Sequence, residues 1–449
     1  MNDYQAVRMV GNETRTRREI EPIPNPLNVV LQTKIIFFFA WMMAAVFYFY
    51  EIMLLISPSF MTHEIERDFG ANSTQIGHLG AFYFYAYAGM QIPVGLLMDR
   101  FGPRILLSLA SLLCALGCII MSEAPNSFIM VAYLGRLIMG VGGAFAVVGC
   151  LKLASLLFPT NRFALLTGIM VTMGMSGAMV AIYFGHDLIE QLGWRSTMSW
   201  GALIGLVLSA IIWFSLAQSK PYFIPHRPKN LIGFWHNLKS VMMNAQVWLV
   251  SIYAGLMYVP TTSFGELWGI RYLSDRFGIT GKEAGLIMIA IFVGWAVGGP
   301  IYGWVSDHIC RRKSPMILAV ILTLAAMLSL MYLPVNHTGM WVLLFLLGAA
   351  SSGFILAFSV VREVNAPLLT GTAIGFINTL NNASGFTQPV IGWLLDVQSP
   401  EIGPTGERIF TLAQFNNALL VIPIGLFIAL LLIPPIRETY CKPIESSKL

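Results

Sequence analysis

Twelve apolar runs, each long enough to cross a lipid bilayer as a helix, dominate this sequence. A spanning helix needs roughly 20 apolar residues, and lipid offers the backbone no hydrogen-bond partner, so each run must be helical. The runs fall at about residues 35–57, 75–97, 104–122, 126–150, 163–185, 197–217, 245–269, 284–305, 315–334, 340–360, 371–395 and 411–435. Only 11% of the residues are charged, against about 25% in soluble proteins. The sequence therefore predicts an all-α membrane protein with twelve transmembrane helices.

Basic residues gather in the polar segments that would lie on one side of the membrane. If the N-terminus is cytoplasmic, the cytoplasmic segments hold about three times as many Lys and Arg as the outer loops. We therefore expect a bacterial inner-membrane protein with both termini in the cytoplasm. These clusters account for the net charge of +5, so the lipid bilayer is an expected partner and nucleic acid is not.

A basic stretch with several prolines divides the apolar runs into two sets of six. This stretch, residues 218–244, is the expected cytoplasmic linker between six-helix bundles at 35–217 and 245–437. Residues 1–34 and 438–449 are polar and are expected to form cytoplasmic tails.

The second inner loop of each half carries a similar pattern, in which a glycine is followed four residues later by an aspartate and then by basic residues. A glycine allows helices to approach closely, and an aspartate can meet a helix N-terminus or an arginine. We expect these loops to form a conformational latch, together with Arg362 and Glu363 at the inner end of the tenth run. For Arg362 and Glu363 a solvated loop is the alternative. The latch residues are Gly95, Asp99, Arg100, Gly102, Arg104, Gly303, Asp307, Arg311, Arg362 and Glu363.

With these motifs the chain resembles the major facilitator superfamily from about residue 35 to 437. The family's R-x-x-x-G motif is matched from Arg136 to Gly140, and Gly193-Trp194-Arg195 and the segment 371–378 are also similar. The resemblance implies two pseudo-symmetric six-helix bundles around a midplane site, a functional monomer and no cofactor.

A finer resemblance concerns segments 50–59, 81–87 and 91–95. They are similar to a bacterial branch that is distantly related to lysosomal dipeptide carriers and to carriers of carboxylate siderophores. The fifth run, 163–185, contains the segment from Gly168 to Gly185 but lacks the Gly-Pro signature of many drug/proton antiporters, which disfavours an efflux pump.

Three ionisable residues stand out in or beside the apolar runs, where a charge costs roughly 2.5–3.5 kcal/mol. Arg136 shares a helix face with Gly140 and Gly143, and we interpret it as a ligand of a substrate carboxylate or a coupling partner. A buried structural ion pair is the alternative. Glu51 is a candidate for proton or substrate coupling, or for a permanent ion pair with Arg136 or Lys152. Lys152 either serves transport or extends to the cytoplasmic surface.

Polar side chains mark two further runs. Tyr87 and Gln91 lie four residues apart in the second run, and Asn378 and Asn382 lie four apart in the eleventh, so each pair shares a helix face. We expect these four to bind a polar solute, with bonding between helices as the alternative.

The outer end of the seventh run carries Glu266, Trp268 and Arg271. We expect the two charged residues to lie at the rim. We expect the tryptophan to lie in the interfacial aromatic belt.

The sequence contains no nucleotide-binding loop, no histidine spacing typical of a metal site and no set of catalytic residues, so we expect neither an enzyme nor a metal. We predict a secondary active transporter that moves a small polar, carboxylate-bearing solute (an organic anion, amino acid or peptide) by alternating access. Protons are a candidate coupling ion. The alternatives are a carboxylate-siderophore importer or exporter, a drug/proton efflux pump and a non-transporting membrane sensor.

Overall fold

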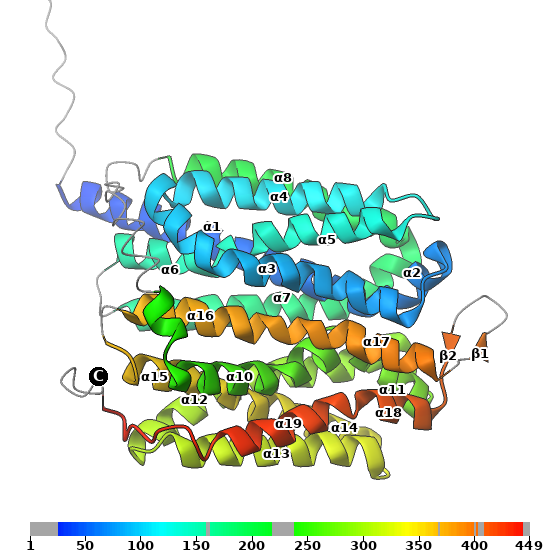
Figure 1. Ribbon diagram of the computed structural model, residues 1–449. Coiled ribbons are helices and arrows are strands. Elements are labelled where there is room, and N and C mark those ends of the chain that lie inside the picture. The colour runs from blue at the N-terminus through cyan, green and yellow to red at the C-terminus, as the bar shows by residue number, and fades with distance from the viewer. Residues whose placement is uncertain are drawn as a thin grey trace, which may run out of the picture.

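The computed structural model describes residues 26–158, 162–217, 238–366, 369–398, 401–402 and 408–442. Helices running side by side make up nearly all of it (Figure 1). Most of both expected tails, and the linker up to residue 237, lie outside the described residues. The division of the chain at 218–244 therefore stays a prediction.

The first half of the chain forms six long helical segments, as the apolar runs predict. The elements are α1 (Pro26–Ile56), η1 (Ser57–Phe60), α2 (Thr62–Phe69), α3 (Ser73–Phe101), α4 (Pro103–Ser122), α5 (Ile129–Gly143), α6 (Phe145–Leu157), α7 (Phe163–Leu192) and α8 (Trp194–Ser215). The first and second segments are connected by two short helices, η1 and α2. The fourth segment is divided at Ala144 into α5 and α6.

The second half also forms six long segments, four of which are divided by a change of helix type or direction. The elements are α10 (Ala245–Val259), η4 (Pro260–Trp268), α11 (Gly269–Phe277), α12 (Gly281–His308), α13 (Lys313–Tyr332), α14 (His337–Ser351), η5 (Ser352–Ile355), α15 (Leu356–Glu363), α16 (Thr370–Asn382), η7 (Ala383–Phe386), α17 (Thr387–Val397), β1 (Glu401–Ile402), β2 (Arg408–Ile409), α18 (Leu412–Leu419) and α19 (Val421–Leu432). The two short strands pair antiparallel, a small departure from the all-α expectation.

Ten helical segments of the described chain are long and apolar enough to cross a membrane by themselves. The segments α3 and α16–α17 are as long but more polar. These two segments lie against each other (Figure 1), and they join the two halves of the chain. Their polar residues are therefore placed in the protein interior rather than in lipid.

Local sequence signals set the ends of these helices. Asn72 accepts the backbone N–H of Gln75, and the Gln75 side chain accepts the N–H of Asn72, which forms a capping box at the start of α3. Gly102 joins α3 to α4 with a φ of +77°, a conformation that favours glycine. Gly102 is thus explained by the turn itself, whatever its part in a latch.

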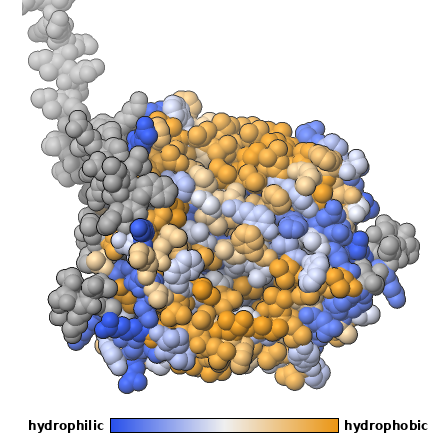
Figure 2. All heavy atoms as spheres, viewed as in Figure 1, coloured by the Kyte–Doolittle hydropathy of each residue, from blue (hydrophilic) through white to orange (hydrophobic). Residues whose placement is uncertain are grey.

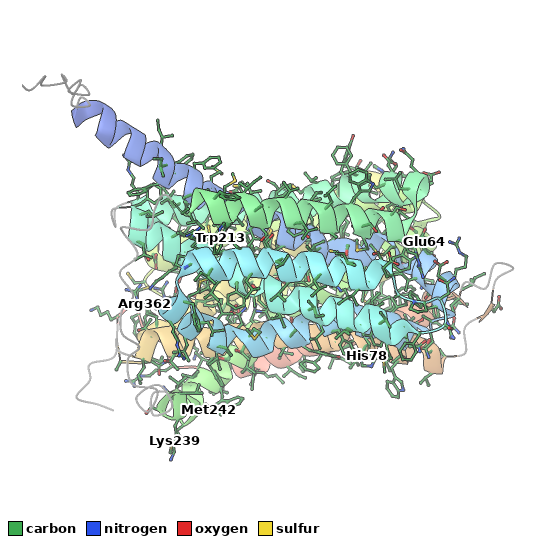
Figure 3. All side chains as sticks on the ribbon, turned by 90° about the horizontal axis from the view of Figure 1, so that it is seen from above. Glu64, His78, Trp213, Lys239, Met242 and Arg362 are labelled. Carbon is green, nitrogen blue, oxygen red and sulfur yellow. The ribbon has the colours of Figure 1, made fainter. Side chains whose placement is uncertain are left out.

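Polar side chains gather at the two ends of the bundle. Glu64 and His78 lie at one end and Lys239 and Arg362 at the other (Figure 3), here called the Glu64 end and the Arg362 end. Figure 2 shows hydrophobic residues over the upper and lower parts of one face, a paler and partly hydrophilic band between them, and hydrophilic residues toward both ends. This distribution is that of a membrane-spanning protein.

The two halves of the chain are tightly joined at the Glu64 end. The carboxylate of Asp396 accepts the backbone N–H groups of Ser73 and Thr74 at 3.0 and 2.7 Å, so an α17 side chain caps the start of α3. A Cβ on Gly77 of α3 would lie 2.5 Å from the Cα of Pro389. The backbones of α3 and α17 can meet this closely only because Gly77 has no side chain.

Toward the Arg362 end the same two segments separate. A Cβ on Gly95 of α3, or on Gly371 or Gly375 of α16, would meet no atom within 4 Å. The latch glycine Gly95 therefore faces open space in this conformation. The two halves are therefore packed tightly at the Glu64 end and less tightly around these glycines toward the Arg362 end.

Candidate functional site

A buried carboxylate lies near the middle of the bundle. Glu51 of α1 is 1% exposed. Its Oε1 accepts a hydrogen bond from the Tyr83 hydroxyl of α3, and its Oε2 has no hydrogen-bond partner in the described part of the chain. Gly143 of α5 lies against both residues, since a Cβ there would lie 3.0 Å from Glu51 Oε1. An incompletely paired carboxylate in this position can gain and lose a proton.

Arg136 of α5 is 0% exposed, and its guanidinium binds backbone rather than a carboxylate. It donates to the carbonyl oxygens of Leu54 and Leu55 at 2.7 and 3.1 Å and to that of Leu79 at 3.1 Å. Its guanidinium carbon also lies 4.8 Å from the centre of the Tyr83 ring. Cations stabilise the C-terminal carbonyls of a helix, and α1 ends directly after Leu55. This geometry favours a structural residue that ties α1, α3 and α5 together.

The four polar residues predicted to bind solute lie together between the two halves. The side-chain amide of Asn378 donates to Gln91 Oε1 at 2.7 Å, and that of Asn382 donates to the Asn378 carbonyl at 2.8 Å. Tyr87 stacks on Tyr83 with 6.0 Å between ring centres. These side chains thus form one polar path from α3 to α16, joined through Tyr83 to Glu51.

Sequence reasoning missed a second buried carboxylate. The expected rim residue Glu266 is only 5% exposed, and its Oε2 has no partner among the described residues. Trp268, expected in the interfacial belt, is fully buried and donates to the Gln388 carbonyl at 3.1 Å. Both predictions were wrong because residues 260–268 form a π-helix, which turns side chains away from the directions that a regular helix gives.

Lys152 is half-buried on α6, beyond the break between α5 and α6. A role for Lys152 in transport and its extension to the cytoplasmic surface therefore both stay predictions.

The residues of the second latch motif, 303–313, form ion pairs within the second half of the chain. Arg312 pairs with Glu363 at 2.6 Å and with Asp307 at 2.7 Å. Arg311 and Arg362, expected in the latch, are exposed, whereas Glu363, also expected there, is buried together with Arg312. The ion pairs of the second motif thus use Arg312, and a latch role for Arg311 stays a prediction.

The first latch motif contacts its own half as well. The Arg104 side chain donates to the Trp213 carbonyl at 3.0 Å and lies 4.0 Å above the Trp213 ring. Arg100 is exposed, and the side chain of Asp99 lies outside the described residues. In this conformation the first motif therefore packs against α8.

The C-terminal segment anchors the start of α13. The two carboxylate oxygens of Glu438 accept the backbone N–H groups of Arg312 and Lys313 at 2.8 and 3.0 Å. Partial burial alone would raise the pKa of Glu438, but the backbone hydrogen bonds outweigh it and hold the pKa below its usual range. The C-terminal segment is thereby tied to the loop that carries the second motif.

This anchor should depend on pH. Because the pKa of Glu438 is lower here than in a detached segment, the anchor is fully present above the ordinary carboxyl pKa and is lost as the pH falls through the lowered value. We expect the amides of Arg312 and Lys313 to lose hydrogen-exchange protection under acid conditions, after correction for intrinsic rates. Glu438→Ala should lose it at neutral pH. Equal protection in the variant would contradict the anchor.

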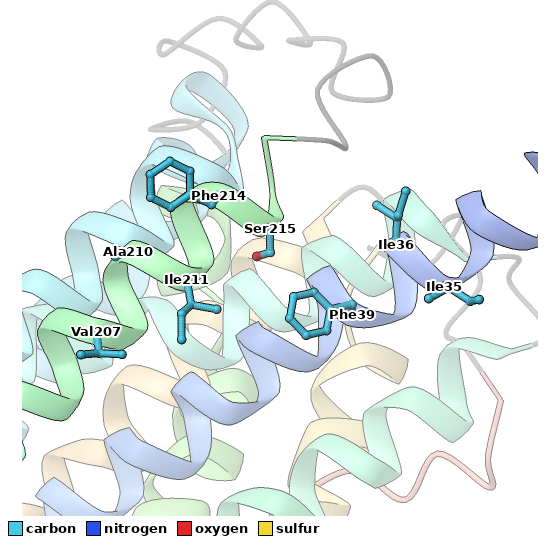
Figure 4. Close-up of a pocket in the computed structure, with 8 residues that line it drawn as sticks. All are labelled: Ile35, Ile36, Phe39, Val207, Ala210, Ile211, Phe214 and Ser215. Atoms are coloured by element: carbon cyan, nitrogen blue, oxygen red, sulfur yellow. The ribbon is translucent and has the colours of Figure 1, made fainter. Parts of the chain in front are cut away.

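An apolar groove of about 630 Å³ lies apart from these residues, between α1 and α8 (Figure 4). It is lined by Ile35, Ile36, Phe39, Val207, Ala210, Ile211, Phe214 and Ser215. A lining this apolar suits lipid chains and offers almost nothing to a polar solute.

Comparison with known proteins decides the family. The model of the Major Facilitator Superfamily matches residues 34–389. This chain belongs to the major facilitator superfamily. As a member of that superfamily it is a transporter and not an enzyme, which confirms the expectation from the loop motifs.

The relatives of this superfamily transporter carry small charged solutes, at low identity. The chain is 24% identical over 373 residues to the probable sulfoacetate transporter SauU of Cupriavidus necator, covering 78% of this chain and 85% of the relative. It is 24% identical over 419 residues to the lysosomal dipeptide transporter MFSD1 of Danio rerio, covering 90% and 88%. The D-galactonate transporter of Escherichia coli O6:H1 is 24% identical over 368 residues, covering 74% and 82%.

A solved structure supports the fold of this superfamily transporter. The bacterial homologue of the human lysosomal transporter Spinster, in its inward-facing and unoccupied conformation, superposes with a TM-score of 0.72 at 14% identity. The match covers 89% of this chain and 96% of that chain. The predicted fold class, an all-helical membrane protein of the major facilitator type, is confirmed.

Proposed function

We propose that this transporter moves a small carboxylate-bearing solute by alternating access and couples that movement to a proton on Glu51. The observation that carries the proposal is the partly paired carboxylate of Glu51, buried beside the polar path between α3 and α16. The relatives that transport sulfoacetate and galactonate support an organic acid as solute.

The proposed cycle uses the two bundles, 35–217 and 245–437, as bodies that rock about the polar path. We place the Arg362 end in the cytoplasm of a bacterial cell, with both termini, because the basic residues concentrate on that side. We propose that the conformation described here, which is packed tightly at the Glu64 end, is the inward-facing one. Opening of the Glu64 end would expose Gln91 and Asn378 to the other side.

A role for Glu51 as the proton carrier predicts the loss of gradient-driven accumulation in Glu51→Gln. A gradient of one pH unit stores about 1.4 kcal/mol per proton, enough for about tenfold accumulation of a solute coupled to one proton. We expect the wild-type protein in proteoliposomes to approach that ratio and the variant to equilibrate the solute without accumulating it. The measurement is uptake from a panel of sugar acids, sulfoacetate, dipeptides and a carboxylate siderophore, with and without the gradient.

Glu123→Gln supplies the matched control, because Glu123 is an exposed carboxylate after α4. It should behave as wild type. If Glu51→Gln accumulated solute as well as wild type, Glu51 would not be the proton carrier. If the wild-type protein moved none of the carboxylates, the proposed substrate class would be wrong.

A further inference from the structure

Two buried carboxylates, one from each half of the chain, lie on helical elements that contact each other. Glu51 belongs to α1 and Glu266 to η4, and these two elements are in contact. Each residue is at least nine-tenths buried and has a carboxylate oxygen without a partner in the described chain. They are also electrostatic neighbours of each other. Unpaired oxygens this deeply buried are costly unless a ligand or a proton satisfies them.

The charges around this pair leave room for one more cation. Arg136 is an electrostatic neighbour of both carboxylates, but its hydrogen bonds go to backbone carbonyls. With both carboxylates ionised and Arg136 charged, the cluster carries one excess negative charge. A single positive group would neutralise it.

Three tyrosines surround the same place. Tyr48 of α1 and Tyr258 of α10 are electrostatic neighbours of both Glu51 and Glu266, and Tyr87 of α3 is a neighbour of Glu51. Tyr258 also neighbours the other two tyrosines. Aromatic faces around a carboxylate are the combination that binds organic ammonium groups, because the ring quadrupole attracts a cation.

Further aromatic rings extend this wall on the side of the second half. Phe354 and Trp295 lie 5.4 and 6.0 Å from the Tyr258 ring, measured between ring centres. Na⁺ would require a shell of oxygens, whereas an ammonium group with its alkyl substituents can use both the carboxylates and the rings. The surroundings therefore favour the organic cation.

We propose that Glu51 and Glu266, with Tyr48, Tyr87 and Tyr258, bind a protonated amine of the transported solute. This inference rests on the proposed function and narrows it, since the solute would be a carboxylate that also carries an amino group, as in an amino acid or a short peptide. When no solute is bound, a proton takes the place of the ammonium group at the same two carboxylates.

The test compares solutes that differ only in the amine. L-aspartate is paired with succinate, and L-alanyl-L-alanine with its N-acetyl derivative, each offered to the full chain in proteoliposomes at constant pH. We expect kcat/KM for uptake of at least one amine-bearing member to exceed that of its partner by about tenfold or more. Glu266→Gln should reduce this ratio below about threefold, whereas Glu123→Gln should leave it unchanged. Replacing Na⁺ by K⁺ should change neither result.

Each other outcome has a separate meaning. If the amine-free acids are transported as well as their partners, or if Glu266→Gln leaves the ratio unchanged, the ammonium site is wrong while the carboxylate carrier stands. If uptake requires Na⁺ rather than the amine, the pair binds Na⁺ and the inference is overturned. If no member of either pair and none of the wider panel is transported, the proposed function fails and this inference fails with it.

Discussion

Arg271→Gln is expected to open the Glu64 end of the transporter. Arg271 of α11 pairs with Glu66 of α2 at 2.5 Å, and both side chains are 1% exposed. Removing one partner of a buried ion pair leaves an uncompensated charge and costs about 3–5 kcal/mol. Because the pair joins the two halves only while this end is closed, that cost falls on the closed conformation. The open conformation should become about 10²- to 10³-fold more populated.

The opening can be measured by thiol labelling. Ser59 is buried beside Arg271 at the closed end, so a cysteine placed there in a chain without its five native cysteines reports exposure of this end. We expect Arg271→Gln to raise the rate of labelling by a membrane-impermeant reagent about 100-fold. Uptake should fall because the carrier no longer closes.

Two comparisons make the result specific. The double variant Glu66→Gln, Arg271→Gln removes the buried Glu66 charge that the single variant leaves without its Arg271 partner, and it should label more slowly than the single variant. Lys282→Gln removes a largely exposed pair with Asp187 at the same end and should change the rate by less than about threefold. Wild-type labelling in Arg271→Gln would show that other contacts hold this end closed.

Arg136→Met is expected to destabilise the whole first half of the chain. The substitution removes three hydrogen bonds from a charged donor to buried carbonyls. Each such bond contributes about 1.5–3 kcal/mol, so the loss should be at least about 4 kcal/mol. Methionine fills part of the volume but cannot pair with the carbonyls of Leu54, Leu55 and Leu79.

Thermal unfolding in detergent distinguishes this structural role from substrate binding. A structural Arg136 predicts a large fall in Tm for Arg136→Met. It also predicts a partial fall for Arg136→Lys, since an ammonium cannot reach three carbonyls with the geometry of a guanidinium. A ligand of the substrate carboxylate would instead give a normal Tm with uptake lost, and that result would restore the first interpretation.

The helices could be predicted from the sequence because a segment in lipid can satisfy its backbone hydrogen bonds only by forming a helix. The apolar runs correctly predicted helices near each observed segment, including the more polar α3 and α16–α17. The breaks within segments were not predicted, because the π-helix at 260–268 and the short turns at 352–355 and 383–386 depend on packing between helices. Hydropathy does not record that packing.

Individual site residues were harder to predict than the region that holds them. Tyr87, Gln91, Asn378 and Asn382 were expected to share a site, and the structure brings them to one polar path. The sequence did not show that Arg312, the neighbour of the predicted Arg311, would pair with Asp307 and Glu363, because that pairing depends on how the loop before α13 packs. Arg136 was placed at the right depth, but the sequence does not say that backbone carbonyls would face it.

The polarity of α3 and α16–α17 also bears on how the protein enters the membrane. Ten segments of the described chain can partition into lipid on their own hydrophobicity, whereas these two carry amides and hydroxyls that lipid would leave unsatisfied. Each must be retained at the insertion machinery until neighbouring helices cover its polar face. Several neighbours of α3, such as α4 and α5, are synthesised directly after it. It contacts α17 as well, so its final burial waits for the last fifth of the chain to be translated.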